Sequence, residues 1–307
     1  MEGHPPTPVA QRNAAPASWM RPVGTAVAAV ALLVTVTGGN CSRERVESMT
    51  RMNEGVLLAQ QKRYVEAIEQ LERAAALDAT NDAAHYNLAI VHIETRKFDR
   101  AREDLTRAIA INPNVAGYHD KLGTVLMELG RWEEARAALE KAVELDPQLF
   151  KAYYRLAQCA ERLDDPQTAL RRYTDAIQHG PRFLEAYAQL GRLYADLGFL
   201  DEAVTTLQSA RQVALEGTEE LAAIHHLLGT VYQQRRQFEQ AIQEFRAALD
   251  ISPGMAEALF SLGWTYGLSN QRAEAIRYLR KYLEVAADAP PHYVKAARDR
   301  ISELEAL

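Results

Sequence analysis

A single small residue, alanine, returns along this chain at an almost constant interval. Five of the six steps are 34 residues long, and the step from Ala203 to Ala241 is 38 residues long. The recurring positions are Ala67, Ala101, Ala135, Ala169, Ala203, Ala241 and Ala275. Such a period is typical of repeat proteins, in which each repeat is one supersecondary unit that packs on its neighbours. The period therefore predicts one stack of similar units with a continuous core.

The stretch that begins at Lys121 shows what one unit contains. Leu122, Leu126 and Leu129 recur at spacings of four and three, which places them on one face of a first helix. Gly130 can adopt a left-handed conformation and end that helix. A second apolar stripe then follows in Trp132, Ala135, Leu139 and Ala142. One unit is therefore predicted to be two short amphipathic helices joined by a tight turn.

The unit resembles a tetratricopeptide repeat. Its first-helix leucine returns at Leu88, Leu122, Leu156, Leu190, Leu228 and Leu262. The resemblance implies an all-α fold, a right-handed superhelical solenoid of seven helix–turn–helix repeats. We expect the repeats at about residues 48–81, 82–115, 116–149, 150–183, 184–221, 222–255 and 256–289.

The two ends and one irregular step add further expectations. Apolar residues at helical spacing from Val294 to Leu304 predict a C-terminal capping helix within 290–307. Glu54 replaces the leucine of the first repeat, which suits an end repeat with one exposed side. The four extra residues of the long step fall within 215–221, and we expect them to lengthen the second helix of repeat five.

The N-terminal 47 residues lie outside the repeats. We expect a disordered segment at 1–21, a signal or membrane-anchor segment at 22–42 and a linker at 43–47. Cys41 ends the uncharged run and resembles the acylated cysteine of bacterial lipoproteins. Two outcomes stay open, a lipid anchor at Cys41 or an uncleaved N-terminal anchor, and the chain can start at Met1 or Met20. Either anchor predicts an exported protein held at the membrane of the cell envelope.

Composition and motifs argue against several classes of function. A formal net charge of -6 gives no general attraction to nucleic acid. The two cysteines exclude a disulfide framework, and Cys159 is expected to be a half-buried structural thiol. The sequence has no Gly-rich phosphate loop, paired-His zinc motif or nucleophile elbow. We therefore predict no enzyme activity, no cofactor, no metal and no small-molecule substrate.

Histidines at one repeated place need no catalytic explanation. His85, His119 and His225 occupy the fourth place of their repeats. The family usually has an aromatic residue there, at a helix interface, so we expect these side chains to be structural.

The resemblance implies that the first helix of each repeat lines a concave groove. In repeats one and two this groove includes Met52, Tyr86 and Ile90, an apolar surface that suits an apolar peptide or helix. The alternative is that the N-terminal linker folds back and covers it.

The middle of the predicted groove is mixed in charge. Its residues include Lys121, Lys151, Tyr154, Arg155 and Arg192, which could take a carboxylate or an acidic segment. Lys151 and Arg155 match the last two places of the carboxylate clamp in chaperone-binding members, but the earlier places do not match. The alternative is a solvated face with internal ion pairs.

The last repeat places two large aromatic residues in the groove. Phe260 and Trp264 are either anchors for a partner or packing residues beneath the capping helix. The leading hypothesis is an interaction scaffold that holds a peptide or protein partner. The alternative is an adaptor subunit of an envelope enzyme or of a pilus or secretion assembly system.

Overall fold

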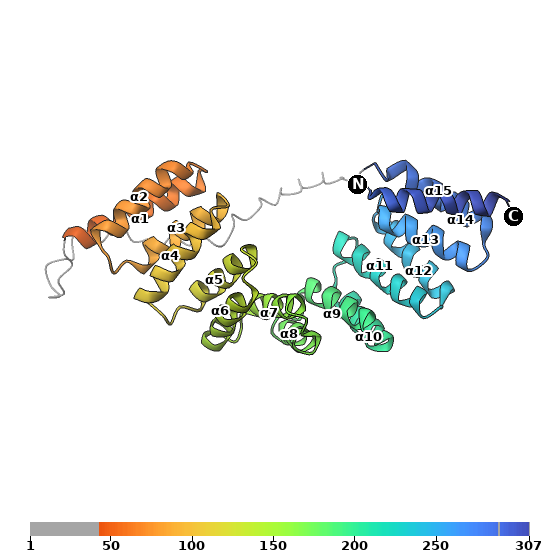
Figure 1. Cartoon of the computed structure of the whole chain (residues 1–307), viewed down its shortest axis with the longest axis horizontal. Helices are drawn as coiled ribbons and strands as arrows, with labels where there is room; N and C mark the ends of the chain where they lie inside the picture. The colour runs from red at the N-terminus through yellow and green to blue at the C-terminus, as the bar shows by residue number, and fades with distance from the viewer. Residues whose placement is uncertain (1–42, 288, 307) are drawn as a thin grey trace, which may run out of the picture. The chain divides into compact units, whose positions relative to one another are not determined.

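The computed structural model describes residues 43–287 and 289–306. These residues form helices joined by short turns, with no strand among them, so the all-α class is confirmed (Figure 1). In chain order the helices form seven pairs and one last single helix. Their bounds are α1 Arg43–Gln60, α2 Tyr64–Leu77, α3 Asp82–Glu94, α4 Phe98–Ile111, α5 Ala116–Glu128, α6 Trp132–Leu145, α7 Phe150–Arg162, α8 Pro166–His179, α9 Leu184–Asp196, α10 Leu200–Val213, α11 Glu219–Gln234, α12 Phe238–Ile251, α13 Ala256–Leu268, α14 Arg272–Val285 and α15 Pro291–Ala306.

The chain divides into two compact units within α5, one ending at Val125 and the other beginning at Leu126. In the first unit α1 lies beside α2, and α3 lies beside α4 (Figure 1). In the second unit the pairs from α7–α8 to α13–α14 repeat this arrangement, and α15 packs on α14. The first helices α3, α7, α9, α11 and α13 thus each contact the second helix of their own pair and the pair before it.

Small residues let the two helices of a pair approach closely. The recurrent alanines from Ala67 to Ala275 are 0% exposed. At Gly191 an added Cβ would lie 2.6 Å from Cγ of Leu207, a residue of the paired helix. The core of each pair is therefore a large side chain from one helix set against a small residue of the other.

A left-handed residue ends every first helix. Gly130 and Gly198 have φ of 72° and 83° at this place. Five other repeats use a non-glycine residue there, namely Lys62, Arg96, Asp164, Arg236 and Asn270. The turn geometry is thus retained without the residue that favours it most.

The extra residues of the long repeat do not lengthen its second helix, as the sequence analysis expected, but fall within 215–221 before and at the start of the next helix. The second helix of repeat five, α10, has the usual 14 residues and ends at Val213. The following helix, α11, is the longer one, with 16 residues. Thr218 caps it by accepting a hydrogen bond from the backbone N–H of Leu221, and two glutamates in its first turn favour this early start. Gly217, with φ of 74°, supplies the turn before the cap.

Two further boundaries can be compared with the sequence predictions. Residues 43–47, predicted as a linker, form the beginning of α1, so that prediction is wrong. The capping helix is present as α15. The predicted segments 1–21 and 22–42, with Cys41, lie outside the described residues. No helix in the described part of the chain is long and apolar enough to cross a membrane.

Candidate partner-binding surface

A pocket of about 480 Å³ lies at the C-terminal end of the second unit. Residues of α11, α13, α14 and α15, with the turn before α15, form its walls. We call it the C-terminal pocket, and its lining is His226, Ala256, Glu257, Phe260, Ser261, Tyr282, Val285, Ala286, Ala289, Pro290 and Tyr293. Its volume falls within the range of pockets that bind ligands.

Three aromatic rings form one side of the C-terminal pocket. The ring of Phe260 meets those of Tyr282 and Tyr293 edge to face, with centroids 5.2 Å apart in both cases. Tyr293 and Val285 remain 45% and 44% exposed. Because large apolar side chains at such exposure are accessible to a partner, the rim of the pocket is a candidate contact surface.

Titratable groups of the pocket are shifted by their burial. Burial lowers the pKa of His226, and the charge of Glu257 opposes this shift. Burial raises the pKa of Tyr282, and the charges of Glu257 and Tyr293 act in the same direction. His226 also shares a hydrogen bond of 3.1 Å with the hydroxyl of Ser261. At neutral pH the imidazole of His226 is therefore uncharged.

The contacts of Phe260 and Trp264 agree with packing beneath the capping helix, while their role as partner anchors stays a prediction. Phe260 packs against Tyr293 of the capping helix, and its ring stacks on Trp264 at 5.7 Å. The guanidinium of Arg300, from the same helix, lies 5.8 Å from the centroid of Trp264. Phe260 lines the open pocket, whereas the ring of Trp264 is in contact with α15.

Two of the apolar residues predicted in the groove of the first unit are not accessible. Met52 and Ile90 are each 4% exposed. Met52 packs in the cluster that includes Leu71 and Leu88, because its place on α1 faces the next pair. The prediction that Met52 and Ile90 lie on a binding surface is therefore wrong, because both side chains are buried. Tyr86 is partly buried, and its ring is tilted by 31° against that of Tyr118, with centroids 4.9 Å apart.

The predicted basic residues of the second unit differ in their environments. Lys151 is exposed, and its Nζ lies 6.0 Å from the ring centroid of Phe150. Tyr154 packs against Phe183, with centroids 5.1 Å apart. Arg192 pairs with Glu161 at 2.7 Å and with Asp196 at 2.8 Å. Arg192 thus supports the alternative of a solvated face with internal ion pairs.

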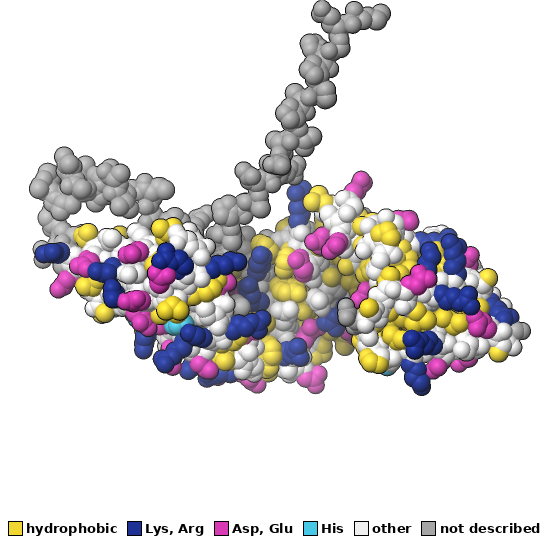
Figure 2. Space-filling view, turned by 90° about the horizontal axis from the view of Figure 1, so that it is seen from above, with side chains coloured by type: hydrophobic (Ala, Val, Ile, Leu, Met, Phe, Trp, Pro, Cys, Tyr) yellow, Lys and Arg dark blue, Asp and Glu magenta, His cyan; other side chains and the backbone are white. Residues whose placement is uncertain are grey.

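Lys121 and Arg155 are each half-buried and have a contact partner. On the face shown in Figure 2, acidic and basic side chains alternate between patches of hydrophobic ones. The structure thus leaves Lys151, on α7, as an exposed basic side chain for the acidic-segment hypothesis.

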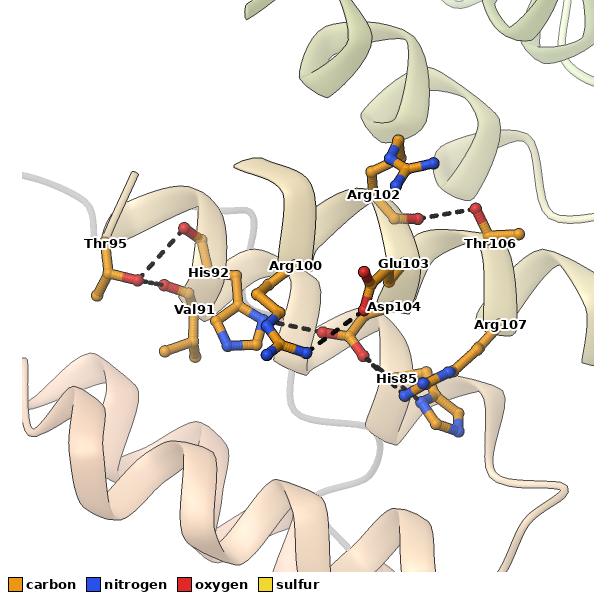
Figure 3. Close-up of polar contacts among 10 residues, drawn as sticks. All are labelled: His85, Val91, His92, Thr95, Arg100, Arg102, Glu103, Asp104, Thr106 and Arg107. Carbon is orange, nitrogen blue, oxygen red and sulfur yellow. Dashed lines mark hydrogen bonds and ion pairs between the residues drawn. The ribbon is translucent and has the colours of Figure 1, made fainter. Parts of the chain in front are cut away.

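The most enclosed titratable cluster of the first unit is structural. Asp104 of α4 lies between His92 and His85 of α3 (Figure 3). Its Oδ2 is 2.8 Å from Nδ1 of His92, and its Oδ1 is 4.0 Å from Nδ1 of His85. The carboxylate also lies 3.7 Å from the guanidinium of Arg107. These contacts join the two helices of one pair, as the repeat position of His85 predicts.

Other residues with possible chemistry are enclosed in the core. Cys159 is fully buried rather than half-buried, and burial raises its pKa to about 11, which keeps the thiol protonated. Across the described ranges, no group of three or more His, Cys, Asp or Glu side chains is arranged to hold a metal ion.

Sequence reasoning missed several residues of the C-terminal pocket. Tyr282 stands where other repeats have an alanine such as Ala248, and this departure was the available signal. No such signal in the sequence pointed to Tyr293 and Glu257. They line the same pocket only because α15 packs against α14, which brings the turn before α15 close to α13.

Comparisons with known proteins agree with the fold. Family models described as tetratricopeptide repeat match residues 58–123, 151–179, 182–253 and 232–298, and one described as TPR repeat matches 123–163. A search of curated protein sequences gives no match.

Solved structures share the fold at low sequence identity. The C-terminal part of a TPR repeat-containing protein from Cytophaga hutchinsonii is 14% identical, with a TM-score of 0.66, and the match covers 80% of this chain and 98% of that one. PilF of Pseudomonas aeruginosa is 18% identical, with a TM-score of 0.57, covering 71% and 97%. YrrB, described as a TPR protein with an unusual peptide-binding site, is 23% identical, with a TM-score of 0.52, covering 62% and 97%. From the helix pairs and the matched residues together, the chain belongs to the tetratricopeptide repeat family.

Proposed function

We propose that this chain is a non-enzymatic scaffold that binds a peptide segment or a partner protein, with the C-terminal pocket as its anchor site. Membership of a repeat family that presents helix faces to other proteins supports this proposal. The peptide-binding site named for the similar protein YrrB supports it as well. The observation that carries it is the C-terminal pocket, an open aromatic pocket between the first helices α11 and α13 and the helices α14 and α15.

The C-terminal pocket has the properties of a protein-binding anchor site. Aromatic residues in a concave site contribute most to binding when a partner side chain fills the space and excludes water. Here Phe260 and Tyr282 form the floor, while Tyr293 and Val285 form an exposed apolar rim. Recognition of one side chain in such a pocket, with weaker contacts along the helices, is the arrangement expected for a peptide ligand.

Along the same unit, Lys151 extends the proposed surface. Its ammonium group is exposed on α7. An acidic residue of the bound segment would gain a charge-assisted contact there. This contact would set direction along the surface, while the C-terminal pocket would supply the larger share of the affinity.

We further propose that the repeats work at the membrane surface of a bacterial envelope, outside the cytoplasm. Support comes from the sequence alone. Positive charge at Arg12 and Arg21 precedes an apolar run without charge, and Cys41 ends it. Lipid attachment at Cys41 or an uncleaved anchor would both hold the repeats there.

Partner capture tests the scaffold proposal. The full chain would be used to capture proteins from detergent-solubilised membranes, alongside Tyr293→Ala and the control Phe199→Ala. Phe199 is a good control because it is 49% exposed, close to the 45% of Tyr293, and it lies just before α10, outside the C-terminal pocket. We expect a partner recovered by wild type and control but reduced at least tenfold with Tyr293→Ala, a change of about 1.4 kcal/mol. Equal recovery by all three would remove the pocket from the proposal, and no specific partner from any of them would contradict the scaffold.

The location is tested by fractionation and mass spectrometry of the expressed protein. A lipidated Cys41 predicts a diacylglycerol-modified N-terminal peptide and release from membranes in Cys41→Ser. An uncleaved anchor predicts an intact N-terminus and membrane retention in that variant. Recovery of both proteins in the soluble cytoplasmic fraction would overturn the location.

A further inference from the structure

The residues that line the C-terminal pocket carry a single kind of charge. They include no lysine or arginine, and Glu257 is the one acidic residue in this described lining. The partly buried imidazole of His226 has a lowered pKa, which favours its uncharged form at neutral pH. The pocket is therefore electrostatically suited to a cation and unsuited to a carboxylate.

Glu257 has no ion-pair partner among the described residues. Two other carboxylates of the second unit do have an arginine partner. Glu161 lies 2.7 Å from Arg192, and Glu244 lies 2.9 Å from Arg211. The carboxylate of Glu257 thus remains available at the edge of an aromatic pocket.

The aromatic rings add a second attraction for a cation. Phe260 meets Tyr282 at an interplanar angle of 65° and Tyr293 at 77°, so the rings present faces in different directions. The face of an aromatic ring is negative and attracts an ammonium or guanidinium group within about 6 Å. Beside the pocket, Trp264 already holds the guanidinium of Arg300 at 5.8 Å. A cation over an aromatic ring is thus already present next to the pocket in the folded chain.

Apolar lining suits the stem of a long basic side chain. Val285, Ala286 and Pro290 add aliphatic surface to the lining beside the aromatic rings. Lysine and arginine bury their methylene stems on such surface while the charged end reaches polar groups. Tyr282 and Ser261 also line the pocket and carry hydroxyl oxygens, which can accept hydrogen bonds.

We infer that the C-terminal pocket recognises a lysine or arginine side chain of the bound segment, with Glu257 as the counter-ion and Phe260, Tyr282 and Tyr293 as the aromatic walls. This inference rests on the proposed function and specifies the chemical class of its ligand. Together with Lys151 on α7, it describes a bound segment with a basic anchor at one end and an acidic residue toward the other.

Peptide selection on the full chain tests the inference. A library of random linear peptides would be selected on immobilised wild-type chain, and each selected peptide would be made again with its basic residue replaced by norleucine. Dissociation constants would be measured on wild type, Glu257→Gln and the control Glu284→Gln. Glu284 is an exposed residue of α14 outside the pocket lining, so its variant makes the same change in charge.

We expect lysine or arginine to be enriched at one position of the selected peptides. Norleucine should weaken binding to wild type and to Glu284→Gln by about tenfold, in line with a cation over aromatic rings plus one ion pair. The same replacement should weaken binding to Glu257→Gln by clearly less than it weakens binding to wild type, because the ion pair is already broken there and only the contact with the rings is left to lose.

Three results would overturn the inference, and they separate it from the proposed function. Apolar peptides that depend on Tyr293 but not on Glu257 would reject the cation and keep the scaffold. Acidic peptides lost in Lys151→Glu would place binding on α7 and also keep the scaffold. Failure of the library and of partner capture alike would reject both.

Discussion

At the scale of single residues, one place in the repeat holds different polar pairs in different repeats. The place joins the fourth residue of the repeat, on its first helix, to a residue of its second helix. The pairs are Arg51 with Gln70 at 3.0 Å, His85 with Asp104 at 4.0 Å, and His225 with Glu244 at 2.6 Å. Because each pair crosses between the helices of one repeat, these side chains hold a helix pair together and need no role in catalysis.

Asp104 is the buried member whose effect on stability depends on pH. Burial acts to raise its pKa, but His85, His92 and Arg107 act in the opposite direction and leave the pKa below its usual value. A carboxylate with a lowered folded-state pKa stabilises the fold fully above its unfolded pKa, and this contribution is lost as the pH falls through the folded pKa. The loss therefore belongs to the acid range, below about pH 4.

Replacement of Asp104 should change both the size and the pH dependence of stability. Asp104→Asn is expected to lower the free energy of unfolding by about 2 kcal/mol at pH 7, because a buried charge-assisted contact is lost. Its stability should then fall less steeply than that of wild type below pH 4. Urea unfolding followed by circular dichroism at several pH values measures both effects.

Glu103→Gln is the control for this variant. Glu103 is a more exposed neighbour that pairs with Arg100 at 3.5 Å, so its loss should change stability by at most about 1 kcal/mol. If Asp104→Asn and wild type lose stability equally toward acid pH, Asp104 is not the group responsible.

At the scale of helices and turns, the turn between the two helices of a repeat contains one residue with a left-handed backbone. In several repeats this residue is not glycine, although glycine adopts that conformation most easily. Arg236 and Asn270 have φ of 60° and 62°, close to the conformation that Gly198 adopts freely. A side chain costs roughly 1–2 kcal/mol in this region, although asparagine tolerates it better. Glycine removes this cost but has a larger entropy loss on folding.

Arg236→Gly should therefore stabilise the chain by about 0.5–1 kcal/mol, the difference between these two effects. Asn270→Gly, at the same place in the next repeat, should change stability by less than about half of that. Both values come from urea unfolding midpoints of the full chain. A destabilised Arg236→Gly together with a stabilised Asn270→Gly would contradict this account of the turn.

The first repeat exposes a helix face that later repeats bury. Leu57 of α1 is 54% exposed, whereas its counterparts Val91 and Val231 are 1% and 2% exposed. In the first unit no described repeat precedes α1, so the face lacks its usual neighbour. The glutamate at Glu54, in the usual place of a buried leucine, fits this exposure.

Substitution at the two equivalent places should separate an end face from a core face. Val91→Ala is expected to cost about 2 kcal/mol, since it leaves a cavity in the first unit. Leu57→Ala should stay within about 0.5 kcal/mol of wild type, as exposed substitutions generally do. Comparable losses in thermal unfolding for the two variants would mean that α1 is covered in the folded chain.

At the scale of the whole molecule, the fold could be predicted because every helix pair repeats the same spacing of small and large residues. Ala67 to Ala275 fix where each pair packs, and this requires no long-range information. The early start of α11 could not be predicted from the period, since it depends on the local cap at Thr218. The same holds for the start of α1 at Arg43.

The candidate site was less accessible to sequence reasoning than the fold. Phe260 was predicted from its place in the repeat, and Tyr282 was visible only as a departure from alanine. Tyr293 joins them through the packing of α15, which no repeat rule describes. Met52 was predicted to line the groove from its place on the first helix, but it is buried. A place on the first helix therefore does not guarantee exposure.

The central claim is that a partner binds at the C-terminal pocket of this repeat protein. Hydrogen–deuterium exchange of the full chain, with and without a captured partner or selected peptide, tests it most directly. We predict slower exchange in α13 and at the beginning of α15, no change in α8 or α10, and loss of the effect in Tyr293→Ala. Protection confined to helices that do not line the pocket would contradict the claim.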